Sequence, residues 1–154
     1  KEKIINIGIL GAKIIGGTLG RKWAAAGHPV MFSVRNPQNP ELQDLVAELG
    51  AGCSAGLPEQ AIESNEVVVF AIPGAAMSET IRRHPALLAG KVVIDAANRT
   101  DGVMNSAADF AAHAPGARYS RAFNSLGWEN FENPLFGGVA ADLFYSGAEG
   151  EGAG

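Results

Sequence analysis

Hydrophobic residues along the chain form short apolar runs that alternate with stretches of helical periodicity. The runs are rich in Val and Ile and are bounded by Gly, Pro and Asn, which is typical of strands buried on both faces of a parallel sheet. They predict seven strands, at residues 4–10, 30–34, 51–53, 67–72, 91–96, 117–122 and 142–146. The stretches between them predict five helices, at residues 14–26, 41–49, 58–64, 75–83 and 106–113. This alternation indicates an α/β fold with a doubly wound parallel sheet of the Rossmann type.

Composition narrows the class of protein. The 154 residues are 47% hydrophobic and 18% charged, which indicates one well-packed domain rather than a disordered chain. The net charge of −4 gives no basic field for a polyphosphate, so we expect no nucleic-acid partner. The longest apolar run, residues 67–73, is far shorter than the roughly 18 residues that span a bilayer, and no secretory leader opens the chain. We therefore expect no membrane partner and a cytoplasmic location.

A single cysteine, Cys53, excludes an internal disulfide and a cysteine-based metal cage. We expect it to be a small buried strand residue, and we predict neither a metal site nor a catalytic side chain. Any redox chemistry of this chain must then come from a source other than cysteine.

The turn after the first predicted strand carries a modified dinucleotide fingerprint. In G-x-G-x-x-G, the first glycine makes the tight turn, the second lets the backbone approach a diphosphate and the third packs the helix on the strand. Here Gly11 and Gly16 fill the first and third positions, and Lys13 replaces the second. The residues predicted to contact the diphosphate are Gly11, Ala12, Lys13, Ile14 and Ile15.

Lys13 leaves three interpretations open. Its side chain impairs cofactor binding, assists it as a point charge beside the phosphates, or points harmlessly outward. A different interpretation, a nucleotide-hydrolysing P-loop over residues 11–18, fits poorly because Gly17 stands where that loop needs its lysine.

The end of the second predicted strand indicates which dinucleotide is bound. NAD-binding folds place an Asp or Glu there for the ribose 2′-hydroxyl, whereas NADP-binding folds use arginine and small polar groups for the 2′-phosphate. The chain has Ser33, Val34, Arg35 and Asn36 at this point and no acid before Glu41. NADP is therefore the predicted cofactor, with Arg35 as the main phosphate ligand; the alternative is that Arg35 is a solvated loop residue.

Four stretches together carry a resemblance to a known family. They are GILGAKIIGGTLG (residues 8–20), VVVFAIPGAA (67–76), KVVIDAANR (91–99) and RAFNSLGWENF (121–131). In these stretches the chain resembles the NADP-dependent deazaflavin (coenzyme F420) oxidoreductases, whose dinucleotide domain is shared with the cytoplasmic domains of ferric reductases. The last two stretches are the most specific, because an aspartate and asparagine after the fifth strand and an AFN tripeptide ending the sixth are not general in dinucleotide folds.

The resemblance implies an enzyme that transfers a hydride between NADP(H) and a deazaflavin or flavin-type acceptor. It implies a dinucleotide-binding domain over residues 1–147, with a glycine-rich end at residues 148–154 that precedes a segment for substrate binding and a possible homodimer. The further cofactor-binding residues that it implies are Ala71, Ile72, Pro73, Ala97, Asn98, Phe123 and Asn124. All of them follow carboxyl ends of predicted parallel strands, where ligands of such sheets collect.

Other residues and functions stay open at this stage. Asp95 is expected to bond loop amides, and the three histidines to have structural roles near helix ends. Trp128, Phe131 and Phe136 form either an apolar wall for a planar acceptor or a hydrophobic loop on the sheet edge. The alternatives to a deazaflavin oxidoreductase are a non-catalytic NADP-sensing module and an NADP-dependent reductase of another small substrate.

Overall fold

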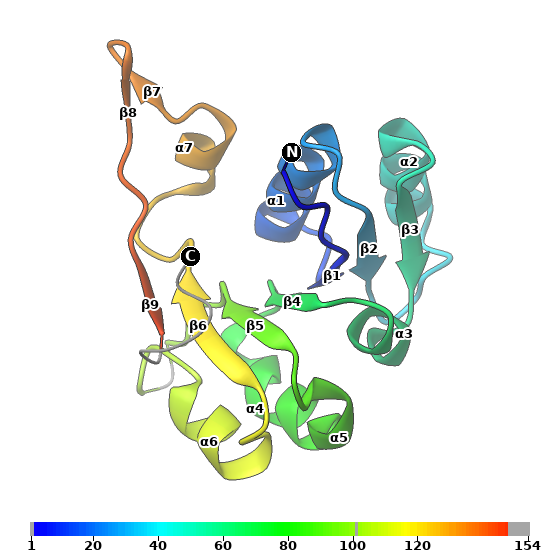
Figure 1. Cartoon of the computed structure of the whole chain (residues 1–154), viewed down its shortest axis with the longest axis vertical. Coiled ribbons are helices and arrows are strands. Elements are labelled where there is room, and N and C mark those ends of the chain that lie inside the picture. The colour runs from blue at the N-terminus through cyan, green and yellow to red at the C-terminus, as the bar shows by residue number, and fades with distance from the viewer. Residues whose placement is uncertain (1, 101, 148–154) are drawn as a thin grey trace.

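The strands of the protein build one mostly parallel sheet in the computed structural model, which describes residues 2–100 and 102–147. Within these residues the sheet has seven strands in the order β3-β2-β1-β4-β5-β6-β9 (Figure 1). Strands β1 to β6 run parallel and β9 runs antiparallel to β6. Their bounds are β1 Ile7–Leu10, β2 Val30–Ser33, β3 Cys53–Gly56, β4 Val67–Phe70, β5 Val92–Asp95, β6 Arg118–Ala122 and β9 Tyr145–Gly147. The predicted fold class is confirmed.

Helices cover both faces of the sheet (Figure 1). One face packs against side chains of α3, α4, α5 and α6, including Met77 and Phe110, and the other packs against α1 and α2, including Leu19 and Leu42. The helix bounds are α1 Ile14–Ala25, α2 Pro40–Leu49, α3 Pro58–Glu63, α4 Gly74–Arg83, α5 Pro85–Leu88, α6 Ala107–His113 and α7 Trp128–Glu132. Two apolar clusters separated by the sheet are the signature of double winding.

Local sequence explains where several elements begin and end. Pro40 and Pro58 occupy the first turns of α2 and α3, where a missing amide hydrogen has no cost. The side chain of Asn39 accepts hydrogen bonds from the Glu41 and Leu42 amides and so caps α2. Gly27, which follows α1, has a φ of 89°, a conformation that glycine adopts without strain.

Two strand predictions were displaced. The third strand covers Cys53–Gly56 rather than residues 51–53, because it pairs with β2 from Val30↔Cys53 to Ser33↔Gly56. Cys53 is half-buried rather than buried, since β3 is an edge strand, and the burial that remains raises the pKa of its thiol. The strand expected at residues 142–146 begins later, at Tyr145.

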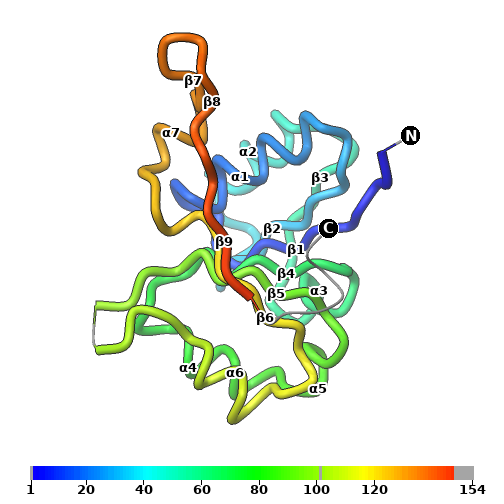
Figure 2. The backbone as a smooth tube through the Cα atoms, turned by 60° about the vertical axis from the view of Figure 1, so that its left-hand side comes forward, coloured from blue at the N-terminus to red at the C-terminus, as the bar shows by residue number. Residues whose placement is uncertain are grey.

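The segment after β6 contains elements that the pattern analysis did not predict. Besides α7, it forms a small hairpin of β7 Leu135–Phe136 and β8 Val139–Ala140, which projects from the body of the protein (Figure 2). The turning residues Gly137 and Gly138 both have positive φ, as a type I′ turn requires. The sequence does contain a signal for this hairpin, because a Gly-Gly pair between apolar dipeptides is typical of a hairpin. The short α5 was also missed. The predicted end segment, residues 148–154, lies outside the described residues.

Candidate functional site

The turn between β1 and α1 is shaped by glycines in tight contact. Gly11 has a φ of 98°, and a Cβ built on it would overlap the carbonyl oxygen of Ala71. A Cβ on Gly16 would overlap the carbonyl oxygen of Gly11, and one on Gly20 would overlap the ring of Phe32. The first and third fingerprint positions therefore need glycine for steric reasons, as the motif predicts. The glycines thus let β1, the turn and α1 approach one another more closely than any side chain would allow.

Lys13 occupies the second position without distorting this turn. It is the N-cap of α1, with φ of −75° and an exposed side chain. Its backbone conformation is one that any residue adopts, so glycine's extra freedom is not needed here. In the described structure no side chain caps this helix end, and the first turn of α1 has no acidic residue. The amides that open the helix and the lysine cation thus lie at the same place.

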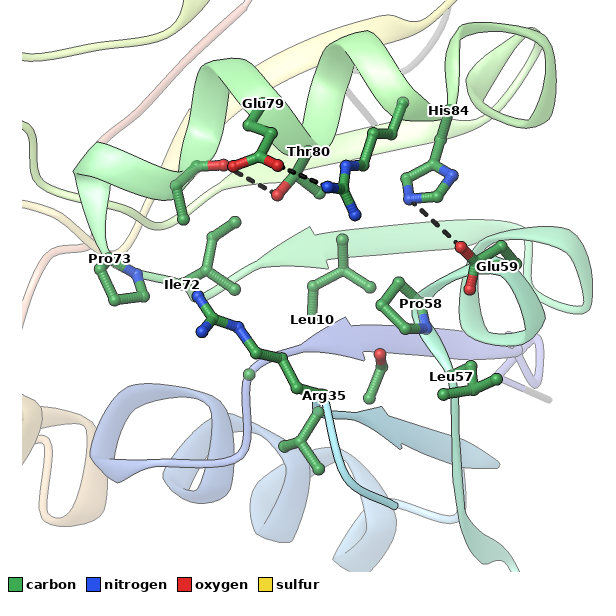
Figure 3. A pocket seen from close by; sticks show the side chains of 15 residues that line it. Leu10, Arg35, Leu57, Pro58, Glu59, Ile72, Pro73, Glu79, Thr80 and His84 are labelled. Carbon is green, nitrogen blue, oxygen red and sulfur yellow. Dashed lines mark hydrogen bonds and ion pairs between the residues drawn. The ribbon is translucent and has the colours of Figure 1, made fainter.

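A cleft of about 700 Å³ opens beside the glycine turn, between the carboxyl ends of β1, β2 and β4 and the helix α4 (Figure 3). Six residues predicted from the sequence line it: Gly11, Ser33, Val34, Arg35, Ile72 and Pro73. The Arg35 side chain extends across the floor toward Ile72 and Pro73 (Figure 3). We call this hollow the α4 cleft.

Ser33, in the lining of the α4 cleft, carries a buried hydroxyl that is unpaired among the described residues. The side chain is 2% exposed, and its Oγ finds no hydrogen-bond partner among the described residues. A buried hydroxyl without a partner costs free energy that a bound polar group restores. Asn36 differs, because it lies outside the cleft lining and its Oδ1 accepts a hydrogen bond from the Gln38 amide.

The wall of the α4 cleft opposite Arg35 contains residues that the sequence analysis did not select. Arg83 is paired with Glu79 at 2.6 Å, and the buried His84 lies 3.9 Å from Glu59 (Figure 3). These side chains lie on α3, on α4 and just beyond α4, and no motif marks them. The packing of α3 beside α5, which directly follows His84, brings them to the cleft.

A second cluster lies where β5 and β6 end, around the fully buried carboxylate of Asp95. Its Oδ1 accepts from the Ala97 amide at 3.0 Å, and its Oδ2 accepts from the Ser106 amide at 3.2 Å and the Tyr119 hydroxyl at 2.8 Å. Arg121 lies 3.5 Å from the same oxygen. Burial and the hydrogen bond to Asp95 raise the pKa of Tyr119, so it remains a neutral donor. The expectation that Asp95 bonds loop amides is confirmed. We call this cluster the Asp95 network.

The Asp95 network supports the residues predicted for the nicotinamide end. The carbonyl oxygen of Ala97 accepts from Arg121 Nη1 at 2.9 Å and from Asn124 Nδ2 at 3.0 Å. Asn98 Oδ1 accepts from Arg121 Nη2 at 3.3 Å and from Asn124 Nδ2 at 3.5 Å. Phe123 precedes Asn124 with a φ of 67°. Two adjacent pairs, Ala97 with Asn98 and Phe123 with Asn124, therefore meet at one point of the sheet edge, although the pairs are 25 or more residues apart along the chain.

The loop that carries Asn98 is also fixed from the other side. A Cβ on Gly74, the first residue of α4, would lie 2.6 Å from the Asn98 carbonyl oxygen, so glycine allows the loop to close on this helix. Asp109 accepts hydrogen bonds from Ser78 Oγ and from Arg99 Nη1, each at 2.6 Å. The Ser78 hydrogen bond, followed by that of Arg99, lowers the pKa of Asp109.

The three aromatic residues of the loop after β6 do not form one wall. Phe131 is buried and packs edge-on against Phe123 at 5.4 Å between ring centroids. Trp128 is 37% exposed at the start of α7, and Phe136 is 56% exposed on the projecting hairpin. The burial of Phe131 agrees with the second interpretation, a hydrophobic loop on the sheet edge. The position of Phe136 agrees neither with that interpretation nor with an apolar wall for an acceptor.

The contacts of His28 are structural. The His28 amide donates to the Trp23 carbonyl oxygen at 3.0 Å and so caps the end of α1, and its Nδ1 accepts a hydrogen bond from the Ile5 amide. None of the helices formed by the described residues has the length and hydrophobicity that crossing a bilayer requires. In the same ranges, 2–100 and 102–147, no three His, Cys, Asp or Glu side chains are placed to share a metal ion.

Comparison with protein families gives one match. Residues 6–99 match the family described as NADP oxidoreductase, coenzyme F420-dependent. This segment covers the strands β1 to β5 and therefore the glycine turn and the α4 cleft. Among curated proteins, none matches the sequence.

Solved structures resemble the chain over most of its length. A protein from Arthrobacter sp. FB24, described as an F420-dependent NADP-reductase, is 21% identical with a TM-score of 0.79, covering 94% of this chain and 74% of its own. A hypothetical protein from Sinorhizobium meliloti is 26% identical with a TM-score of 0.77 over the same shares. A reductive aminase from Aspergillus terreus, in complex with NADPH and ethyl levulinate, is 23% identical with a TM-score of 0.65, covering 83% of this chain and 44% of its own.

Proposed function

The chain belongs to the family of coenzyme F420-dependent NADP oxidoreductases, and on this premise we propose that it transfers a hydride between NADP(H) and a deazaflavin or flavin-type acceptor. The proposal rests on one observation, the placement of the predicted cofactor-binding residues. Residues that the sequence assigns to the two ends of one dinucleotide lie along one edge of the sheet, from Arg35 at β2 to Asn124 at β6. That edge holds the carboxyl ends of the parallel strands, where such sheets bind nucleotides.

The ADP half of the cofactor is proposed to bind between the glycine turn and the α4 cleft. The diphosphate would contact the turn from Gly11 to Ile15, with the Lys13 ammonium as an added cation beside the helix N-terminus. The exposed Lys13 side chain and the unoccupied amides support the assisting role among the three left open by the sequence. Arg35 and the unpaired Ser33 hydroxyl would hold the 2′-phosphate.

The nicotinamide end is proposed to lie against the loop after β5 and the turn after β6. NADP(H), when bound, supplies or accepts the hydride. The protein's own residues then need only bind, orient and keep water out, since hydride transfer requires no nucleophile from the chain. Ala97, Asn98 and Asn124 are tied together by the hydrogen bonds described above, and Phe123 adds an apolar ring beside them.

Cofactor selectivity tests the first half of this proposal. Calorimetric titration should show that Arg35→Ala weakens NADPH binding about 10- to 100-fold, because a charge-assisted pair is worth about 1.5–3 kcal/mol. NADH binding should change by less than about twofold, since NADH lacks the 2′-phosphate. The control is Arg118→Ala, which removes an exposed arginine at the amino end of β6 and should leave both affinities unchanged. Equal loss of NADPH and NADH would overturn the phosphate assignment.

Measurement of NADPH oxidation tests the second half of this proposal, the transfer of a hydride to the acceptor. The protein is mixed with NADPH and, in separate reactions, with an oxidised deazaflavin, a flavin and a cyclic imine, and NADPH oxidation is followed by absorbance. Oxidation by the deazaflavin or flavin supports the proposal, and oxidation by the imine alone would assign another acceptor class. Binding without turnover, unchanged in Lys13→Gly, would instead indicate an NADP-sensing module.

A further inference from the structure

The hairpin of β7 and β8 carries no polar side chain. Residues 134–141 read PLFGGVAA, and residues 134–140 are all exposed. Leu135 pairs with Ala140 and Phe136 pairs with Val139, so each face of this two-stranded ribbon carries one apolar pair. A ribbon of this length is marginally stable alone, and the face that it turns to water is commonly polar. A hairpin that is apolar on both faces indicates that another surface packs on it. We call residues 134–141 the apolar hairpin.

Exposed apolar residues continue from the hairpin into β9. Of the twelve large apolar side chains exposed in residues 2–100 and 102–147, six lie within residues 135–145. They are Leu135, Phe136, Val139, Leu143, Phe144 and Tyr145, with exposed fractions from 43% to 73%. A fully exposed aromatic side chain presents about 150–250 Å², so the three aromatic members alone leave on the order of 400 Å² in water. This is at least about half of the roughly 800 Å² that each partner buries in a stable interface.

An apolar hollow lies at the base of the hairpin, between α1 and α7. It has a volume of about 180 Å³, and its lining includes Leu19, Trp23, Phe123, Phe131, Pro134 and Leu143. The Phe123 ring packs edge-on against Trp23 and Phe131, which fixes the aromatic wall of the hollow. We call it the α7 hollow.

The α7 hollow has the size of one aromatic ring. A dry apolar cavity of about 150 Å³ takes up benzene, so a hollow of about 180 Å³ accommodates a phenylalanine ring. The protein's own Phe136 lies on the projecting hairpin and is not among the described lining residues (Figure 2). The Ala141 amide donates to the Pro134 carbonyl oxygen at 2.8 Å, which closes the base of the hairpin beside the hollow. One molecule therefore presents both an apolar tip and an apolar hollow.

The tip and the hollow are complementary between two copies of the chain. Two hairpins that lie antiparallel across a two-fold axis bring each tip to the base of the other, as an isologous interface requires. The apolar hairpin has no charged residue, so two copies meet there without like charges although each chain has a net charge of −4. A membrane surface fits less well. The acidic residues that flank the hairpin in the chain, Glu129, Glu132 and Asp142, are repelled by anionic lipids.

We propose that this surface joins two copies of the chain, with the Phe136 ring of each copy in the α7 hollow of the other. The association uses the hairpin and the hollow alone, so it does not depend on a bound nucleotide. Phe136, exposed in the single chain, becomes the centre of the interface, where aromatic residues contribute most to binding.

Sedimentation velocity of the whole chain over a concentration series tests the association. The wild-type protein should reach the mass of two chains in the micromolar range. Phe136→Glu should raise the dissociation constant of the dimer at least about 100-fold, because it places a charge in both symmetric contacts. The matched control is Ile4→Glu, which adds the same charge at an apolar side chain that is 65% exposed, against 56% for Phe136. This control should leave the dissociation constant unchanged.

A mixture of two variants tests the pairing of tip with hollow. Leu143→Lys places a charge in the hollow and, like Phe136→Glu, should be monomeric by itself at concentrations where the wild-type protein is dimeric. In an equimolar mixture, one intact tip meets one intact hollow and the two altered residues meet with opposite charges, so dimers should form again. Asn130→Arg, which also alters the hollow, replaces Leu143→Lys if that variant does not fold.

Three results would overturn the proposal. A wild-type protein that is monomeric up to the millimolar range lacks this interface, and cosedimentation of that monomer with phosphatidylcholine vesicles would assign the hairpin to a lipid surface. A dimer that persists in Phe136→Glu is formed by another surface. Two variants that stay monomeric when mixed show that the tip does not enter the hollow. None of these results changes the NADPH titrations, so this inference and the proposed function fail separately.

Discussion

The two ends of the sheet edge are built by different physical means. At β1 and α1, shape comes from the absence of side chains, because Gly11, Gly16 and Gly20 allow backbone and aromatic atoms into contact. At β5 and β6, shape comes from a buried carboxylate that collects two amides, a hydroxyl and a guanidinium. The first end is held by steric exclusion and the second by hydrogen bonds to a buried carboxylate.

The difference determines how each end responds to change. The steric contacts at the glycine turn are disrupted when a larger side chain is introduced, and they do not depend on pH. The Asp95 network is weakened when Asp95 is removed, since the Tyr119 hydroxyl and the Ala97 and Ser106 amides then lose the acceptor described for them. The two ends can therefore be perturbed independently, and stability measurements distinguish them.

The largest effect is expected from Asp95→Ala. Removing the carboxylate leaves the Tyr119 hydroxyl, the Arg121 guanidinium and two amides without their acceptor, and should lower the free energy of unfolding by about 4 kcal/mol. Urea unfolding measures the loss. Asp142→Ala, an exposed aspartate before β9, should change stability by less than about 0.5 kcal/mol. A loss below about 1 kcal/mol for Asp95→Ala would mean that the network is not a support of this end.

Adding one methyl group at the other end should have a somewhat smaller effect. Gly16→Ala places a Cβ on the Gly11 carbonyl oxygen and should cost about 3 kcal/mol in urea unfolding. The matched control is its neighbour Gly17→Ala, whose Cβ would lie 3.3 Å from the Ala12 carbonyl oxygen. There the better helix propensity of alanine, about 1 kcal/mol, should offset the tight contact. If the two variants were equally stable, steric exclusion would not explain this turn.

The smallest effect, and one that depends on pH, is expected at Asp109. Its hydrogen bonds to Ser78 and Arg99 lower its pKa below the ordinary 3.8, so the ionised carboxylate stabilises the folded state above that value. Asp109→Asn should therefore cost about 1 kcal/mol near neutral pH, and the difference should shrink as the pH falls below 3.8 and through the lowered pKa of the folded state, because the folded carboxyl is then protonated. Unfolding across this range checks the sign. A difference that grows toward low pH would contradict it.

The sequence predicted the two ends unequally, for a physical reason. Glycine spacing and the residues after β2 are local signals, and Gly11, Ser33 and Arg35 were found by them. Apart from the Ala97 amide, the partners of Asp95 lie 11 to 26 residues further along the chain, and the pairing of β5 with β6 brings Tyr119 and Arg121 to it. Phe123 carries no signal at all, because a positive φ is not expected for phenylalanine. The hydrophobic periodicity of the sequence likewise does not predict the packing between helices that brings Arg83 and His84 to the α4 cleft.

Because Lys13 has an ordinary backbone conformation, this turn separates the path of the backbone from the identity of the side chain at the second fingerprint position. Most dinucleotide turns join these two properties in one residue. Gly11 and Gly16 allow the tight path of the chain, and the side chain between them is exposed. The identity of residue 13 can therefore vary in charge and length while the architecture around it stays the same. Such a position acts as a tuning point, at which affinity for an anionic ligand is adjustable without a penalty in folding.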